Sequence, residues 1–244
     1  MCSKGRFEVR IGILETDTVD KNIREQQGSY ADMFQRLFLS IDNNIEFRVY
    51  QVIEGEYPEN INECSAYLIT GSQSSAYENI LWIDQLCQYI VQLNKYKIKL
   101  IGICFGHQVI AQALGGRVEK SEKGWGVGKT ICDVWLIKPW MRVPGEDVAD
   151  QFSLLVTHQD QVTGLPDGAE CIAGNDFCEI ASFQIAEHIL SFQGHPEFSV
   201  DYLMYLMNKR RDLIGESKYS AAIESMKTEV DARLITQWII NFLS

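Results

Sequence analysis

The chain of 244 residues is long enough for one large domain or two small ones around a buried core. It is 46% hydrophobic and 23% charged, which is the composition of an ordinary soluble globular protein. Its net charge of −11 argues against nucleic acid as the main partner, because phosphate binding depends on clustered Lys and Arg.

Membrane and disulfide-rich classes are also disfavoured. No run of eighteen apolar residues is present, and the first residues lack the apolar segment of a secretory signal. The seven cysteines are scattered, with no C-x-x-C pair, which argues against a disulfide scaffold or a zinc site. We therefore expect a protein of the reducing cytoplasm with no bound metal.

The N-terminal part alternates strand-like and helix-like segments. Apolar runs or alternation predict strands, and apolar residues spaced by three or four predict helices. The expected strands are residues 7–14, 46–52, 65–71 and 97–104, and the expected helices are 28–41 and 80–94. Strands separated by helices of this length predict an α/β fold with a mostly parallel sheet and crossover connections.

The middle of the chain changes character. Between residues 116 and 192, short β-like runs are separated by turn signals such as Leu-Pro-Asp-Gly. This pattern predicts a small antiparallel extension that returns to the main sheet.

After Pro196 the chain reads as helical to its end. Two segments, 200–214 and 221–243, carry apolar residues at helical spacing, and the short basic cluster 209–211 reads as a solvated helix end. We find no repeat or linker, so residues 199–244 are expected to be a helical extension of the domain formed by 1–198. Their apolar stripes are expected to pack onto that domain, with a homodimer or partner interface as the alternative.

The segment Gly102-Ile103-Cys104-Phe105-Gly106 has the form G-x-S-x-G with cysteine in place of serine. In that motif a strand turns sharply into a helix and presents a nucleophile at the corner, and the glycines avoid a clash in the turn. The helix N-terminus favours a thiolate, and the amide of Phe105 would face an oxyanion. The alternative is a buried cysteine between incidental glycines.

A thiolate nucleophile needs a base, and the chain has four histidines. His195 lies in "QGHPEF", and Glu197 lies on the same side of an extended backbone, so its carboxylate could orient the imidazole. The alternative for this segment is a polar loop that ends a strand. His107 and His188 are expected to be structural.

The segments "GICFGHQ" and "QGHPEF" together resemble the class I (triad) glutamine amidotransferase family. This resemblance implies a flavodoxin-like fold and a catalytic triad of Cys104, His195 and Glu197. It also implies an oxyanion hole and a substrate pocket. The oxyanion donors would be Gly71 and Phe105, and the pocket residues would be Gln108, Tyr77, His158 and Gln159.

The segment "KGWGVG" (123–128) resembles the stand-alone, GMP-synthase-like members of this family. The chain has no Gly-rich S-G-G-x-D loop like that of an ATP-pyrophosphatase domain, so it is not expected to make GMP alone. The oxyanion loop reads Thr-Gly-Ser where Gly-Gly-Pro is commoner, which leaves its rigidity open.

The activity implied is hydrolysis of the γ-carboxamide of glutamine through a γ-glutamyl thioester, with no cofactor and with ammonia passed to an acceptor enzyme. The first alternative is a hydrolase of γ-glutamyl peptides or conjugates. Two further alternatives are a non-catalytic binding module and a cysteine hydrolase of the intracellular-protease type. That last type usually has His directly after the Cys, where this chain has Phe105.

Overall fold

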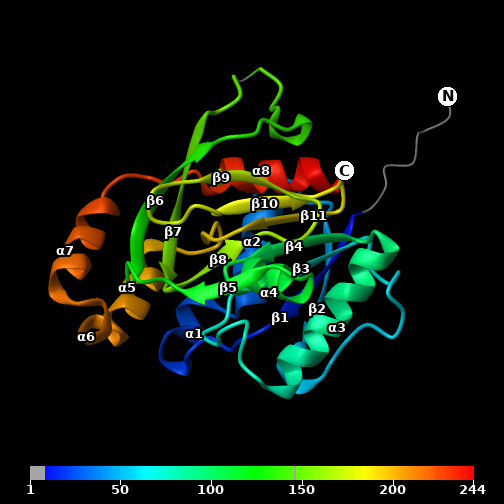
Figure 1. Cartoon of the computed structure of the whole chain (residues 1–244), viewed down its shortest axis with the longest axis horizontal. Helices are drawn as coiled ribbons and strands as arrows, with labels where there is room; N and C mark the ends of the chain where they lie inside the picture. Colours follow the sequence, from blue (N-terminus) through cyan, green and yellow to red (C-terminus); the bar gives the residue numbers. More distant parts are fainter. Residues whose placement is uncertain (1–8, 146) are drawn as a thin grey trace.

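A nine-stranded sheet forms the centre of the molecule in a computed structural model, which describes residues 9–145 and 147–244 (Figure 1). Five adjacent strands of this sheet are parallel. In spatial order they are β2 (Glu46–Gln51), β1 (Arg10–Glu15), β3 (Ala66–Ile69), β4 (Lys99–Ile103) and β11 (Ile189–Phe192). This 2-1-3-4-5 order is that of the flavodoxin-like doubly wound fold, and it confirms the predicted α/β class.

Four antiparallel strands extend the sheet beyond β11. In spatial order they are β10 (Ser182–Ile185), β9 (Ala169–Gly174), β6 (Gly126–Val134) and β7 (Gln151–His158). A separate two-stranded sheet pairs β5 (Arg117–Lys120) with β8 (Asp160–Gly164). The predicted antiparallel extension is therefore confirmed, and the small second sheet was not foreseen.

Helices cover both faces of the sheet (Figure 1). One face packs against α2 (Tyr30–Leu39) and α8 (Ala232–Leu243), and the other against α3 (Leu81–Tyr96) and α4 (Phe105–Ala113). A third apolar cluster joins α1 (Lys21–Gln27) to α5 (Val200–Lys209), α6 (Arg211–Ile214) and α7 (Glu216–Ser225). Two short 3₁₀ turns, η1 (Val52–Glu54) and η2 (Pro139–Met141), complete the elements. Within the described residues, no helix has both the length and the apolar character needed to cross a bilayer.

Local signals explain where the elements depart from expectation. Residues 7 and 8 of the predicted first strand lie outside the described residues. The helix predicted from residue 28 begins at Tyr30, because Ser29 and Asp32 form a reciprocal capping box. The C-terminal region forms four helices where two segments were expected, and Gly215, with φ +83°, separates two of them.

The parallel strands bring distant segments to one edge of the sheet. Strands β1, β3 and β4 are followed directly by Thr16, Thr70 and Cys104, and β11 leads into the segment with His195. Because these strands are adjacent and parallel, their carboxyl ends meet. In open α/β sheets, ligands bind outside the carboxyl ends at the point where strand order reverses, which here lies between β1 and β3.

Candidate active site

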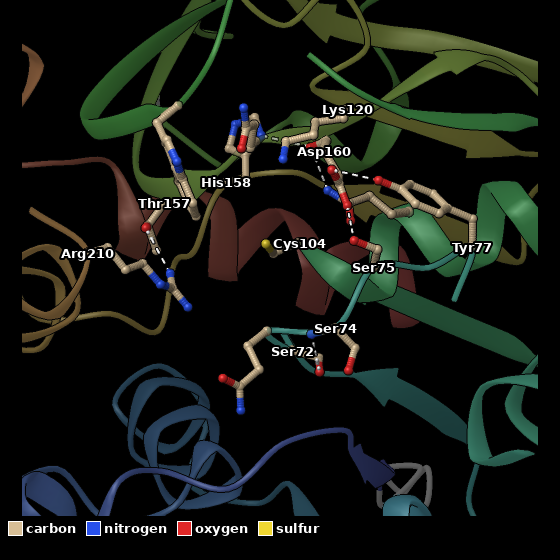
Figure 2. A pocket seen from close by; sticks show the side chains of 14 residues that line it. Ser72, Ser74, Ser75, Tyr77, Cys104, Lys120, Thr157, His158, Asp160 and Arg210 are labelled. Carbon is tan, nitrogen blue, oxygen red and sulfur yellow. Dashed lines mark hydrogen bonds between the residues drawn. The ribbon is translucent and has the colours of Figure 1, made fainter. Parts of the chain in front are cut away.

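Cys104 lies at the corner between β4 and α4 and lines a cleft (Figure 2). Its φ of +53° is rare for a residue with a side chain, and such strain persists where the surrounding structure enforces it. Both flanking glycines are required by close packing. A Cβ on Gly102 would lie 2.5 Å from Ile110 Cδ1, and a Cβ on Gly106 would overlap the carbonyl oxygen of Ile69.

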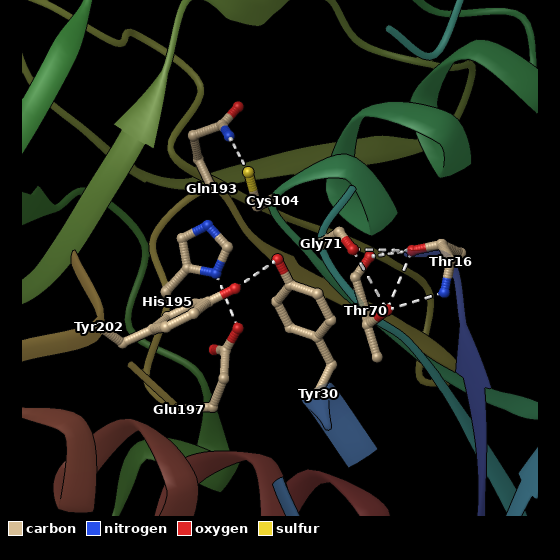
Figure 3. Close-up of polar contacts among 9 residues, drawn as sticks. All are labelled: Thr16, Tyr30, Thr70, Gly71, Cys104, Gln193, His195, Glu197 and Tyr202. Atoms are coloured by element: carbon tan, nitrogen blue, oxygen red, sulfur yellow. Dashed lines mark hydrogen bonds and ion pairs between the residues drawn. The ribbon is translucent and has the colours of Figure 1, made fainter. Parts of the chain in front are cut away.

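The imidazole of His195 lies between Cys104 and Glu197 (Figure 3). Its Nδ1 is 2.7 Å from Oε1 of Glu197, and both side chains are almost fully buried. The backbone of His195 is fixed by a bridge to Leu155 of β7, and its ring stacks on Phe198 at 3.7 Å between centroids. With Nδ1 engaged by the carboxylate, Nε2 is the nitrogen left for a reacting group.

Charge determines the protonation of His195. Burial by itself lowers the pKa of this imidazole, but the charges of Glu197 and Cys104 outweigh that effect and raise the net pKa above its ordinary value. His195 is therefore held between two groups whose negative charge favours the imidazolium form.

Gly71 lies directly against the imidazole. A Cβ at this position would be 2.9 Å from His195 Cε1 and 3.8 Å from Cys104 Cβ, so only glycine fits without moving the ring. The preceding carbonyl, on Thr70, accepts hydrogen bonds from Gly106 N and from Thr16 Oγ1. Since the peptide is trans, the Gly71 N–H points away from both of these donors.

The two amides expected at the oxyanion hole are free to donate. Among the described residues, neither Gly71 N–H nor Phe105 N–H makes a hydrogen bond. Thr16 Oγ1 also donates to the carbonyl of Gly71, which fixes the loop from both sides of the glycine. The side-chain hydroxyl of Thr16, directly after β1, thus replaces part of the rigidity that a proline would supply.

The four residues expected in the substrate pocket all line the cleft, and Asp160 organises three of them (Figure 2). Gln108 Nε2 donates to the carbonyl of Asp160 at 2.7 Å, and His158 Nδ1 lies 3.0 Å from the same oxygen. Tyr77 OH donates to Asp160 Oδ1 at 3.1 Å. Gln159, the fourth, lines the cleft without any of these contacts. Burial lowers the pKa of His158 to about 4, so this imidazole is neutral.

The other two histidines are structural, as the sequence predicted. His107 is fully buried and its ring nitrogens lie 2.9 Å from Ser191 Oγ and 3.1 Å from the Ile180 carbonyl oxygen. His188 Nε2 is 2.7 Å from Asn94 Oδ1. Neither imidazole lines the cleft.

The sequence interpretation missed a glutamine next to the sulfur. Gln193 Nε2 donates to Cys104 Sγ at 3.5 Å, while its Oε1 accepts from Gln108 at 3.0 Å (Figure 3). Its position two residues before His195 was the available signal. Arg210, from the C-terminal helices, also lines the cleft and was missed, because its cluster reads as a solvated helix end.

The described residues include no group of three His, Cys, Asp or Glu side chains suited to a metal. All six cysteines in this part of the chain are unbridged.

The sequence and the fold were compared with those of known proteins. The family model "Glutamine amidotransferase class-I" matches residues 28–203. Gamma-glutamyl peptidase 2 of Arabidopsis thaliana is 29% identical, over 96% of this chain and 95% of that protein. A glutamine amidotransferase-like protein of Schizosaccharomyces pombe is 31% identical, over 97% of this chain and 99% of its own length. The crystal structure of a glutamine amidotransferase from Thermotoga maritima has the same fold, with a TM-score of 0.72 at 20% identity over 98% and 97% of the two chains.

Proposed function

The chain belongs to the class-I glutamine amidotransferase family, and on that basis we propose that it hydrolyses γ-glutamyl amide bonds through a thioester on Cys104. Glutamine is the simplest substrate of this kind. The proposal is supported most directly by one observation, which is that His195 lies between Cys104 and Glu197 with no room for a side chain at Gly71.

In the first half of the reaction, Sγ of Cys104 attacks the γ-carbonyl carbon. The negative charge that forms on the carbonyl oxygen is stabilised by the N–H groups of Gly71 and Phe105. Nε2 of His195 then gives its proton to the leaving nitrogen, the C–N bond breaks, and a γ-glutamyl thioester remains.

In the second half, water replaces the amine. His195, now neutral, accepts a proton from the water as the oxygen attacks the thioester carbon. The C–S bond breaks, glutamate leaves and the sulfur recovers its negative charge beside the imidazolium. Glu197 keeps the ring in the orientation that both halves require.

The test measures product release and the intermediate together. Purified protein is given glutamine and a panel of γ-glutamyl dipeptides, with ammonia or amino acid release as the readout, and intact-mass spectrometry follows a one-glutamyl adduct. We expect turnover with at least one compound and an adduct that is absent in Cys104→Ala. An equal rate in Cys104→Ala would contradict the proposal.

A γ-glutamyl peptide is the second candidate substrate. Relatives named gamma-glutamyl peptidase match this chain over 76–98% of its length, which supports a leaving group larger than ammonia. If glutamine is the substrate, an acceptor enzyme would use the ammonia, and adding that enzyme would raise turnover.

We also propose a cytoplasmic location, because the nucleophile must stay a reduced thiol.

A further inference from the structure

The segment 209–211 contains three consecutive cations, and they have different surroundings. Lys209 pairs with Asp20 at 2.5 Å and Arg211 with Glu216 at 2.7 Å. Arg210, between them, pairs with no carboxylate within the described residues. Asp17 shares a neighbouring pocket with Arg210, but its oxygens accept from the backbone N–H groups of Thr18 and Gln73.

Arg210 is held at the wall of the cleft by the break between α5 and α6. Its Nη1 donates to Thr157 Oγ1 at 3.2 Å, and its guanidinium lies over the ring of Trp125 at 5.4 Å. A guanidinium has five N–H donors, so most of them remain available in the cleft. In a chain with a net charge of −11, an unpaired and half-buried cation that faces a cleft indicates an anionic ligand.

The position of Arg210 relative to Cys104 determines which part of a substrate it can reach. Thr157, its partner, lies two residues beyond Leu155 on β7, and Leu155 bridges to His195. Arg210 is therefore on the His195 side of the nucleophile. Figure 2 shows Asp160, Ser75 and Tyr77 on the other side of Cys104.

These two sides match the two ends of a γ-glutamyl peptide. The carboxylate of Asp160 suits the α-ammonium of the glutamyl group, and Lys120, its register partner across β5 and β8, suits the α-carboxylate. His195 must face the leaving nitrogen in order to protonate it, so the leaving group extends toward Arg210. Ammonia, the leaving group from glutamine, carries no anionic group that could bind the guanidinium of Arg210.

We propose that Arg210 binds a carboxylate on the leaving group and so makes the enzyme selective for γ-glutamyl peptides over glutamine and neutral amides. This inference rests on the proposed hydrolysis, which it deepens by naming the substrate class. Arg210 is a specificity residue that touches the substrate, whereas Trp125 and Thr157 position its guanidinium.

The experiment compares γ-glutamylglycine with γ-glutamylglycinamide, which differ only in the terminal carboxylate. We expect the wild type to prefer the acid by roughly ten- to a hundredfold in kcat/KM, mainly through KM, as is typical of one charge-assisted contact. Arg210→Gln should remove this preference by lowering kcat/KM for the acid toward that for the amide, while Arg210→Lys should restore part of it. Arg211→Gln is the matched control and should retain the wild-type preference.

Binding to the Cys104→Ala variant, measured by calorimetry, separates this inference from the proposed hydrolysis. Preference for the acid in binding, lost in Cys104→Ala/Arg210→Gln, would support the site even if neither compound were hydrolysed. Hydrolysis of both compounds without preference, or a preference that survives Arg210→Gln, would overturn the assignment of Arg210 and leave the hydrolysis intact.

Discussion

Single atoms decide the geometry at the centre of this site. Gly71 has no Cβ, and that absence lets His195 lie against the loop that ends β3. Cys104 accepts a strained backbone because Gly102 and Gly106 let the strand and helix meet closely. The residues without side chains therefore matter as much to the site as the reactive ones.

Adding one methyl group at Gly71 should displace the imidazole. In Gly71→Ala the new Cβ would lie 2.9 Å from His195 Cε1, so the ring must move away from the sulfur. We expect kcat to fall by roughly a hundredfold, with a small change in unfolding free energy. Steady-state kinetics and urea unfolding measure the two effects. The matched control is Gly164→Ala, where the nearest atom would be at 3.4 Å, and a similar loss of kcat in the control would contradict this account.

Replacing Glu197 should shift the pH dependence of the reaction. The charges of Glu197 and Cys104 raise the pKa of His195, so the imidazole keeps its proton to a higher pH than usual. In Glu197→Gln one of these charges is gone and the proton is lost at lower pH. The alkaline limb of the kcat/KM profile should therefore shift to lower pH by about one pH unit or more. The pKa that this limb reports is an apparent value that belongs to the coupled Cys–His pair. Asp201→Asn, at an exposed carboxylate, should leave the profile unchanged, and an unmoved limb in Glu197→Gln would refute the assignment.

At the scale of elements, the site is built by strand ends and supported by helices. Strands β1, β3, β4 and β11 each deliver one segment to the same edge. Helix α8 is the last element of the chain, and it packs on α2 and β7. Its Trp238 is fully buried against Trp140 and Phe152. The C-terminal helix is thus part of the hydrophobic core that keeps the strands in place.

Truncating Trp238 should destabilise the whole fold. Trp238→Ala removes a completely buried indole, and such cavities typically cost about 3–5 kcal/mol of unfolding free energy. Urea denaturation should show a lower midpoint with a similar slope. Arg233→Ala, at an exposed position of the same helix, should change the midpoint little. An equal effect of the two changes would show that α8 is not an integral part of the core.

At the scale of the molecule, one sheet brings Cys104 and His195 together. Cys104 follows β4 and His195 follows β11, and these strands are adjacent although all four strands of the antiparallel extension lie between them in sequence. The C-terminal helices then cover the sheet and supply Arg210 to the cleft. We propose on this basis that residues 1–198 and 199–244 form a single domain.

Buried neutral histidines should make the folded protein sensitive to mild acid. Burial lowers the pKa of His107 to about 3 and that of His158 to about 4, whereas in an unfolded chain the value is about 6.5. Below pH 6.5 the unfolded chain therefore binds protons that the folded protein does not, and stability falls as the pH falls toward these values. Each histidine should cost about 2 kcal/mol at pH 5 relative to neutral pH.

Urea unfolding of the wild type and of His107→Gln at pH 7 and pH 5 measures this linkage. The variant should be less stable at pH 7 but should lose less stability between the two pH values. Identical losses in both proteins would mean that His107 does not contribute to the acid sensitivity.

Much of the site could be predicted from sequence, because local chemistry determined it. A cysteine between two glycines at a strand end predicted the corner, and the Gly-His-Pro-Glu segment predicted a histidine with a carboxylate beside it. The strand and helix periodicities predicted the α/β class. These features depend on neighbours within a few residues, and short-range sterics and hydrogen bonding fix them.

Some of the residues that meet from distant parts of the chain were not predicted from the sequence. Thr16 supports the Gly71 loop, Gln193 donates to the sulfur, and Arg210 lines the cleft. Gln193 has a sequence signal in its position two residues before His195, whereas strand order and helix packing alone bring Thr16 and Arg210 to the site. Short-range sequence features therefore predicted the groups that we propose to react, and the packing of the whole chain fixed the surroundings that we propose to select a substrate.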